Sequence, residues 1–180
     1  MILHLVRHPK PVVPANTCYG RLDVPVEGVE AAAERLRALL PADLPVWTSP
    51  LARCRSLAEC LHPAPVVDER LAEMHFGDWE GRAWDDIGPL ALDAWAADVG
   101  GFVPPGGESA LALQARALAF VAELAVEEAV LVTHAGVMRM LLAHWQGLEA
   151  ADWTRLNFGY GTVTSVELTL FGGTLLHFNR

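Results

Sequence analysis

The sequence predicts an α/β fold, a three-layer α/β/α sandwich around a mostly parallel central sheet. The first observation is that short apolar runs alternate along the chain with amphipathic helical stretches, which is the order expected when helices cover both faces of a parallel sheet. The second is that two of these runs end abruptly in polar residues. The four expected strands are Ile2–Val6, Pro45–Thr48, Pro65–Val67 and Ala129–Thr133.

Four helices are expected between and after these strands. Glu27–Leu40 carries one apolar stripe at helical spacing. Ser49 and Pro50 are typical of an N-cap followed by proline at the first helical position, which opens a helix over Leu51–Leu61. The remaining helices are a long Ala/Leu-rich segment, capped by Glu108 and Ser109, and a segment directly after the fourth strand: Glu108–Glu127 and Gly136–Trp145.

The end of the chain predicts a hairpin, with strands Thr162–Leu170 and Thr174–Phe178 on either side of Gly172-Gly173. This hairpin would add antiparallel strands to one edge of the sheet. Residues 81–107 are the least regular stretch, rich in tryptophan, proline and glycine. We expect a partly helical excursion there that covers a site like a lid, within one domain spanning residues 1–180.

Composition limits the classes of function. The 180 residues are 52% hydrophobic and have a formal net charge of −9, which argues against a nucleic-acid binder or a protein of anionic membranes. No segment has the length of a membrane span, and no signal peptide is recognisable. The three cysteines, Cys18, Cys54 and Cys60, fit reduced thiols in a cytoplasmic protein.

Two imidazoles are expected at the same edge of the sheet. Arg7 and His8 follow the first strand, and His134 follows the fourth strand where a helix begins. The carboxyl ends of parallel strands bind ligands in such sheets, and a helix N-terminus attracts anions. An Arg-His pair there suggests phosphate chemistry with an imidazole nucleophile. The alternatives are a solvated strand end for Arg7 and His8, and an N-cap or buried core histidine for His134.

Arg53 falls in the first turn of its expected helix. A cation there opposes the helix dipole by roughly 0.3–1 kcal/mol, which is easier to understand if an anion binds between the guanidinium and the helix amides. The alternative is an exposed arginine paired with Glu59 or Asp78.

Acidic and aromatic residues alternate in the run from Leu71 to Gly81. A carboxyl held against apolar groups has a raised pKa and can act as a general acid near neutral pH. Glu73 is the candidate, with Asp78 and Glu80 as alternatives. Otherwise the run is a loop whose acids cap turns.

Taken together, these motifs resemble the histidine phosphatase superfamily, with its phosphoglycerate mutase-like fold. Five motifs stand in the family's order: Arg7-His8, Ser49-Pro50-Leu51-Ala52-Arg53, Leu71-Ala72-Glu73-Met74-His75-Phe76-Gly77-Asp78-Trp79-Glu80-Gly81, Gly106-Gly107-Glu108-Ser109 and Val132-Thr133-His134-Ala135-Gly136.

The resemblance implies a mechanism. His8 would carry a phosphohistidine, while Arg7, Arg53 and His134 hold the phosphoryl oxygens. Glu73 would protonate the leaving oxygen and then accept a proton from water. Neither metal nor cofactor would be needed, because the arginines and the second imidazole supply positive charge.

The chain departs from the family pattern directly after the nucleophile. The family usually has Arg-His-Gly-Glu, whereas Pro9 and Lys10 stand here, and proline has no N–H to donate to phosphate. Asn16 is displaced from the family's asparagine. The loop Tyr19-Gly20-Arg21 resembles the family's substrate loop, and Arg21 would meet an anionic group or hydroxyl of the substrate or, alternatively, pair with Asp23 or Glu27.

The resemblance is strongest to the alpha-ribazole phosphatase group, which dephosphorylates alpha-ribazole 5′-phosphate in cobalamin synthesis. The chain lacks the long insertion of phosphoglycerate mutases, which favours hydrolysis. The alternatives are a broad-specificity small-molecule phosphatase and, because of Pro9, a non-catalytic phospholigand-binding module. A metal-dependent hydrolase is disfavoured because His4 and His8 stand too far apart to chelate one ion. The expected partner is a small phosphorylated substrate, and a homodimer is compatible with the sequence.

Overall fold

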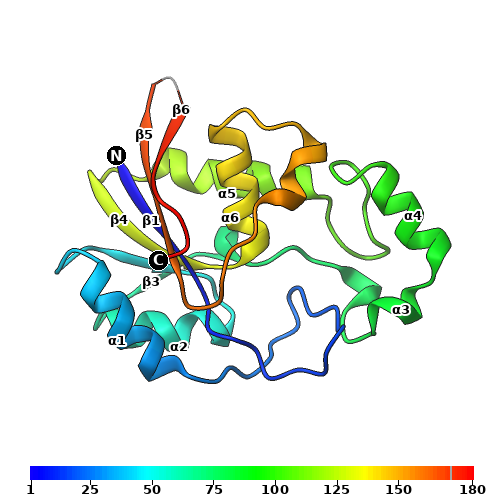
Figure 1. The fold of residues 1–180 in the computed structure, drawn as a ribbon, viewed down its shortest axis with the longest axis horizontal. Coiled ribbons are helices and arrows are strands. Elements are labelled where there is room, and N and C mark those ends of the chain that lie inside the picture. The colour runs from blue at the N-terminus through cyan, green and yellow to red at the C-terminus, as the bar shows by residue number, and fades with distance from the viewer. Residues whose placement is uncertain (171) are drawn as a thin grey trace.

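The computed structural model describes residues 1–170 and 172–180. Its strands form a six-stranded sheet in the order β3-β2-β4-β1-β5-β6 (Figure 1). The strands are β1 (Ile2–Arg7), β2 (Val46–Thr48), β3 (Val66–Val67), β4 (Glu128–Thr133), β5 (Val163–Thr169) and β6 (Gly172–His177). The first four are mutually parallel, whereas β5 pairs antiparallel with β1 and with β6. The predicted α/β fold with a mostly parallel sheet is therefore confirmed.

Helices cover both faces of this sheet (Figure 1). They are α1 (Val29–Leu39), α2 (Ala52–Leu61), α3 (Trp84–Ile87), α4 (Pro89–Ala97), α5 (Ala110–Glu123) and α6 (Ala135–Trp145). Three short 3₁₀ segments, η1 (Glu69–Leu71), η2 (Gly77–Trp79) and η3 (Ala150–Arg155), connect them.

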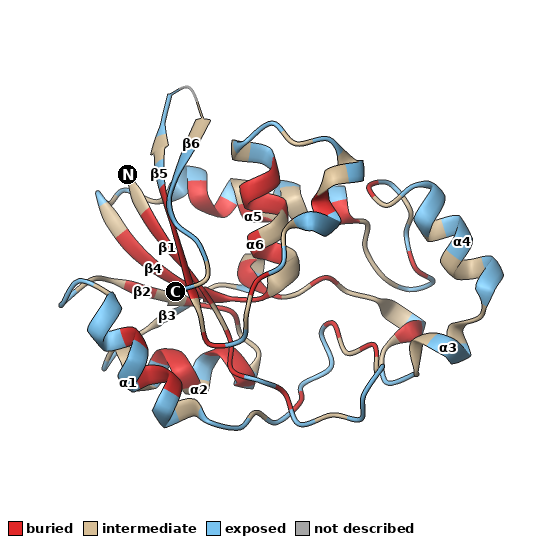
Figure 2. Ribbon diagram, viewed as in Figure 1, coloured by how far each residue is buried: buried red, intermediate tan, exposed pale blue. Residues whose placement is uncertain are grey.

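Two separate hydrophobic clusters show why the sheet is covered on both sides. Leu3 and Leu5 of β1 pack with α5 and α6 in one cluster, whereas Val6 of the same strand packs with α1 and α2 in the other. Alternate side chains of a strand point to opposite faces, so a continuous apolar run serves both layers. Figure 2 shows the resulting buried band through the sheet and the inward sides of these four helices.

Two local predictions were wrong. Gly172 and Gly173 do not form the hairpin turn, because they begin β6 and pair with Thr169 and Leu168. A side chain at Gly173 would collide with Trp145 and Val166. Glycine is therefore required at this position by close packing and not by the conformation of a turn.

Ser49 does not cap α2. The helix begins at Ala52 with Leu51 in the cap position, and the Ser49 hydroxyl lies at the end of β2. Ser109 does cap α5, accepting a hydrogen bond from the Ala112 amide at 3.1 Å, as predicted. The helix is shorter than the expected Glu108–Glu127 because the chain leaves it after Glu123 to enter β4.

The segment of residues 81–107 contains α3 and α4 and lies beside the loop of residues 8–28 (Figure 1). Backbone hydrogen bonds join the two: the Trp84 amide donates to the Asn16 carbonyl, and the Cys18 amide to the Arg82 carbonyl. Asn16 adopts φ 64°, so it shapes this contact as a turn residue. The partly helical character expected for this segment is present. Within the described residues, no helix is long and apolar enough to cross a membrane.

Candidate active site

The polar strand ends meet at one edge of the sheet, as the parallel register requires. Arg7 is level with Thr133 in the β1–β4 pair, and Thr48 is level with Val132 in the β2–β4 pair. The next residues of the three strands are therefore His8, His134 and Ser49. The His8 amide donates to the Thr133 carbonyl at 3.1 Å, and the two imidazole rings lie 5.1 Å apart.

His8 is buried, with 1% of its surface exposed. Its Nδ1–H donates to the Pro9 carbonyl at 2.6 Å, which leaves Nε2 as the unprotonated ring atom. Burial and the nearby guanidinium of Arg53, with a smaller contribution from Arg7, lower the pKa of His8 to about 3. The imidazole is therefore neutral at physiological pH, the state a nucleophile requires.

Pro9, directly after His8, has a backbone carbonyl that can accept a hydrogen bond but no backbone N–H that can donate one. Its carbonyl oxygen fixes the tautomer and orientation of His8. It has no N–H to offer a phosphate. Proline at this position therefore lacks the amide donor, while its carbonyl still holds the His8 ring.

Arg7 lies at the same edge with its guanidinium over the ring of Tyr160, 3.6 Å from the ring centroid. One terminal N–H group donates to the Phe158 carbonyl. Its Nε is buried and has no hydrogen-bond partner in the part of the chain that the structure describes. A buried donor of this kind is costly unless a ligand satisfies it.

Arg53 is completely buried in the first turn of α2, which rules out an exposed pair with Glu59 or Asp78. Its Nε donates to Nδ1 of His134 at 3.2 Å, and its terminal nitrogens donate to the carbonyls of Leu22 and Gly20. A guanidinium has five N–H groups, so donors remain for an anion.

Both ring nitrogens of His134 are engaged by the protein. Nδ1 accepts from Arg53, and Nε2–H donates to the Ser49 hydroxyl at 2.7 Å. Burial, then Arg53 and His8, hold the pKa of His134 well below its usual range. In this geometry His134 orients Arg53, and a direct bond from His134 to phosphate would require its ring to turn away from Ser49.

The Glu73 carboxylate reaches the same edge from the loop after η1. One oxygen accepts from the Met74 amide at 2.9 Å and the other from the Gly136 amide at 3.1 Å. A Cβ at Gly136 would stand 2.1 Å from that carboxylate, so only glycine allows this approach.

The two alternative acids have other positions. Glu80 accepts hydrogen bonds from the amides of Arg21, Leu22 and Phe76. It therefore connects the predicted substrate loop (residues 19–21) to the run of residues 71–81. Asp78 is exposed beside Gly106. Glu73 is therefore the acid of the three that lies against the His134–Gly136 turn.

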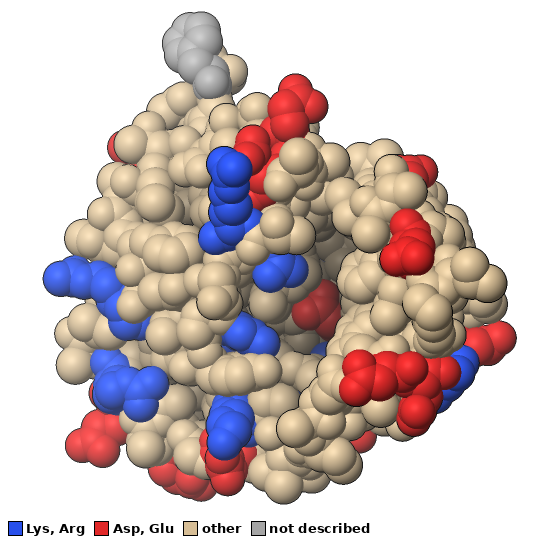
Figure 3. All heavy atoms as spheres, turned by 45° about the vertical axis from the view of Figure 1, so that its right-hand side comes forward, with Lys and Arg blue, Asp and Glu red and all other residues tan. Residues whose placement is uncertain are grey.

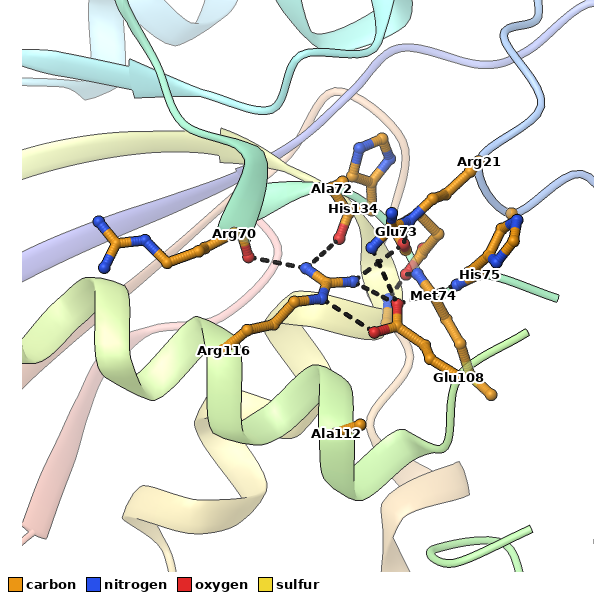
Figure 4. A network of polar contacts seen from close by, with 12 residues as sticks. Arg21, Arg70, Ala72, Glu73, Met74, His75, Glu108, Ala112, Arg116 and His134 are labelled. Atoms are coloured by element: carbon orange, nitrogen blue, oxygen red, sulfur yellow. Dashed lines mark hydrogen bonds and ion pairs between the residues drawn. The ribbon is translucent and has the colours of Figure 1, made fainter. Parts of the chain in front are cut away.

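A network behind Glu73 holds its backbone (Figure 4). Arg116 of α5 donates to the carbonyls of Arg70 and Ala72 at 2.7 Å and to that of Glu73 at 3.0 Å. Its charge is balanced by Glu108, 2.6 Å away, which also accepts from the His75 amide. The pKa of Glu108 lies below its usual range because the hydrogen bond and charge of Arg116 outweigh the effect of burial.

The predicted substrate loop lies against the same site. Gly20 packs so closely on the Met74 carbonyl and Phe76 that a side chain would collide with both. The Tyr19 hydroxyl lies 3.2 Å from that of Tyr160. Arg21 reaches Glu108, at 3.4 Å, and the Glu73 carbonyl, which excludes the alternative that it pairs with Asp23 or Glu27. Asp23 instead accepts from the Ala52 amide at the start of α2.

A cavity of about 300 Å³ opens beside Glu73 and Gly136. Figure 3 shows the surface hollowed on this side of the molecule, with basic side chains gathered along one wall and acidic atoms inside it. Within residues 1–170 and 172–180, no cluster of three or more histidine, cysteine, aspartate or glutamate side chains is arranged to hold a metal ion.

Sequence reasoning missed three contributors to the site, namely Ser49, Arg116 and Tyr160. Arg116 could have been identified from helical spacing, because it stands three residues after Leu113 and four before Phe120, on the buried side of α5. Tyr160 lies in an irregular loop before β5, where no periodicity connects it to Arg7.

The geometry matches a known family. The model of the histidine phosphatase superfamily (branch 1) matches residues 3–180, so the chain belongs to that superfamily. It is a phosphatase of this class, and the resemblance predicted from the five motifs is confirmed.

The chain is similar to curated phosphatases of two names. The chain is 34% identical to the glucosyl-3-phosphoglycerate phosphatase of Mycolicibacterium vanbaalenii, over 83% of this chain and 75% of that protein. It is 28% identical to the adenosylcobalamin/alpha-ribazole phosphatase of Escherichia coli, over 97% and 94%. The solved mycobacterial glucosyl-3-phosphoglycerate phosphatase has a TM-score of 0.85 at 30% identity, covering 99% of this chain and 98% of that one.

Proposed function

We propose that this protein hydrolyses small phosphomonoesters through a phosphohistidine on His8, without a metal ion. The observation that carries this proposal is the state of His8: it is buried, neutral and fixed through Nδ1 by the Pro9 carbonyl, which leaves Nε2 to attack. Because His8 is held in this way although Pro9 follows it, we disfavour the alternative of a non-catalytic phospholigand-binding module.

In the first step, Nε2 of His8 forms a bond to phosphorus while the bond to the ester oxygen breaks. The leaving oxygen takes a proton from Glu73 and departs as an alcohol. In the second step, water gives a proton to the Glu73 carboxylate and attacks the phosphorus, the N–P bond breaks, and phosphate leaves. His8 and Glu73 return to their starting states.

Positive charge for the transferring phosphoryl group comes from two arginines, the partly buried Arg7 and the fully buried Arg53. Arg7 has an unsatisfied Nε, and Arg53 has donors left after its bonds to His134, Leu22 and Gly20. His134 and Ser49 hold Arg53 in place, so these donors are ordered before substrate binds.

For the substrate we propose alpha-ribazole 5′-phosphate, supported by the resemblance of the Tyr19–Arg21 loop and by the nearly complete coverage of the E. coli relative. The higher identity of the mycobacterial relative favours glucosyl-3-phosphoglycerate as a second candidate. A phosphatase without preference between them is the remaining alternative.

The test is phosphate release from both candidates and from 4-nitrophenyl phosphate, measured as kcat/KM with wild-type protein and with His8→Ala. We expect turnover of the generic ester, a marked preference for one candidate, and loss of activity in the variant. Phosphate binding without turnover of any ester would instead support the phospholigand-binding module.

A further inference from the structure

A cavity beside Glu73 is lined by residues of α4, α5, α6 and η3 (residues 89–97, 110–123, 135–145 and 150–155). Glu73 and Gly136 belong both to this lining and to the candidate active site. Because Glu73 protonates the ester oxygen in the proposed reaction, the group attached to that oxygen extends into this space. The inference that follows therefore rests on the proposed function and specifies its substrate class.

The walls of the cavity are mainly apolar. Seven large apolar side chains line it: Met74, Phe76, Trp95, Val99, Leu113, Met140 and Trp153. Besides Glu73, the polar side chains at its wall are those of Arg139 and Thr154. A polyol placed there would exchange most of its hydrogen bonds with water for apolar contacts, whereas a ring would lose little hydration.

Trp95 is a pre-ordered part of this wall, although it comes from the irregular segment. Its indole stacks on that of Trp84, with centroids 5.5 Å apart and planes inclined by 11°. Phe76 and Trp79 meet it edge-on at 5.9 and 6.0 Å. Such a cluster costs little further ordering when a flat ligand packs against it.

Arg139 contributes a cation to the lining of the cavity. Its Nε donates to the Leu156 carbonyl at 3.2 Å, and the carboxylate whose charge acts on it, Glu73, forms no ion pair with it in residues 1–170 or 172–180. A partly buried guanidinium that is not bonded to a carboxylate is well suited to the face of an aromatic ring.

We propose that this cavity is the leaving-group subsite and that it selects phosphomonoesters of alcohols that carry an aromatic ring. Trp95 and Trp153 form the apolar walls for that ring, and Arg139 contacts its face. Trp95 is then a specificity-determining residue supplied by the segment of residues 81–107.

The test compares two primary alkyl phosphates, so that the leaving oxygens have similar intrinsic reactivity. One is 2-phenylethyl phosphate and the other is glycerol 3-phosphate. We expect wild-type kcat/KM to be at least about tenfold higher for the phenylethyl ester. Trp95→Ala should lower that value by about tenfold and change the value for glycerol 3-phosphate by less than about twofold.

Leu90→Ala is the matched control, because Leu90 lies on the same helix, α4, but is 87% exposed. It should leave both substrates unaffected. Equal kcat/KM for the two esters in the wild type, or an equal loss for both in Trp95→Ala, would overturn the subsite. Absence of turnover for these esters and for 4-nitrophenyl phosphate alike would instead refute the proposed function.

Discussion

At the scale of single residues, the protonation state of His8 follows from its surroundings. A histidine in water is partly protonated near neutral pH, and its ring is then no nucleophile. Burial and two guanidinium groups remove that proton here, lowering the pKa to about 3. The arginines that would bind the phosphoryl group thus also keep the attacking atom free.

This arrangement makes folding sensitive to acid. Because the pKa of His8 is lowered from 6.5 to about 3 on folding, the unfolded chain binds a proton in this interval that the folded chain does not. The His8 contribution to stability is therefore complete above pH 6.5 and is lost as the pH falls towards 3. We predict that His8→Gln reduces the slope of unfolding free energy against pH by about 1.4 kcal/mol per pH unit between pH 4 and 6.

Urea unfolding of both proteins at four pH values in this range would measure that slope. Identical slopes for wild type and variant would show that His8 is protonated in the folded protein. His134→Gln should produce a change of the same sign, because the pKa of His134 is also lowered by burial.

A substitution at Gly136 should affect activity without affecting stability. A methyl group there would stand 2.1 Å from a Glu73 oxygen, the far end of a flexible side chain, so the carboxylate would move aside. Alanine is otherwise favourable in a helix, by up to about 1 kcal/mol. We predict that Gly136→Ala lowers kcat/KM roughly 100-fold, the order of loss a 1 Å displacement of a reacting group causes, with little change in melting temperature.

A double-mutant cycle with Glu73→Gln tests the cause. If Gly136→Ala acts by displacing Glu73, the two losses do not add, and the double variant resembles Glu73→Gln alone. Fully additive losses would mean that Gly136 acts through another group.

At the scale of elements, helix α5 supports the loop that carries Glu73, the proposed general acid. Arg116 binds three carbonyls of the Arg70–Glu73 backbone and is itself balanced by Glu108. In the proposed mechanism it is a positioning residue, since Glu73 is there the group that touches the leaving oxygen. Removal of the Glu108 charge would leave Arg116 half-buried without an ion-pair partner, at a cost of up to about 3–5 kcal/mol, whereas without Arg116 the Glu108 carboxylate would keep only its longer contact with Arg21, at 3.4 Å.

We predict that Arg116→Gln lowers kcat far more for an alkyl phosphate than for 4-nitrophenyl phosphate, with KM nearly constant. An alkyl leaving group needs the proton from Glu73, whereas nitrophenolate departs without one. Arg116→Lys should recover part of the alkyl activity. Equal losses for both esters would indicate general unfolding instead of misplacement of Glu73.

The success of prediction from sequence differed between elements for physical reasons. Strands β1 and β4 and helix α6 were predictable because each has one strong pattern, a continuous apolar run or an amphipathic stripe. The edge of the sheet where Arg7, His8 and His134 meet followed from strand direction alone. The role of Gly172 and Gly173 was not accessible, since it depends on their contact with Trp145, a distant residue. The engagement of both nitrogens of His134 likewise depends on side-chain placement by three separate elements.

At the scale of the whole molecule, charge is distributed unevenly. The chain has a net charge of −9, yet Arg7 and Arg53 concentrate positive charge at the edge of the sheet. In the proposed mechanism this local charge takes the place that a divalent cation fills in other phosphatases.

We therefore predict that extended treatment with a chelator, followed by dialysis, leaves kcat/KM unchanged within about twofold, because the arginines supply the stabilising charge. The measurement is phosphate release before treatment, after it, and after return of Mg²⁺ or Zn²⁺. Activity lost with the chelator and restored by one of these ions would contradict this account.

His8 carries the phosphoryl group in the proposed mechanism, and rapid quenching of turnover with a ³²P-labelled ester would trap that intermediate. We predict an acid-labile, base-stable phosphate on the wild-type protein, mapped to His8 by mass spectrometry and absent from His8→Ala. Label on another residue, or turnover by His8→Ala at the wild-type rate, would contradict it.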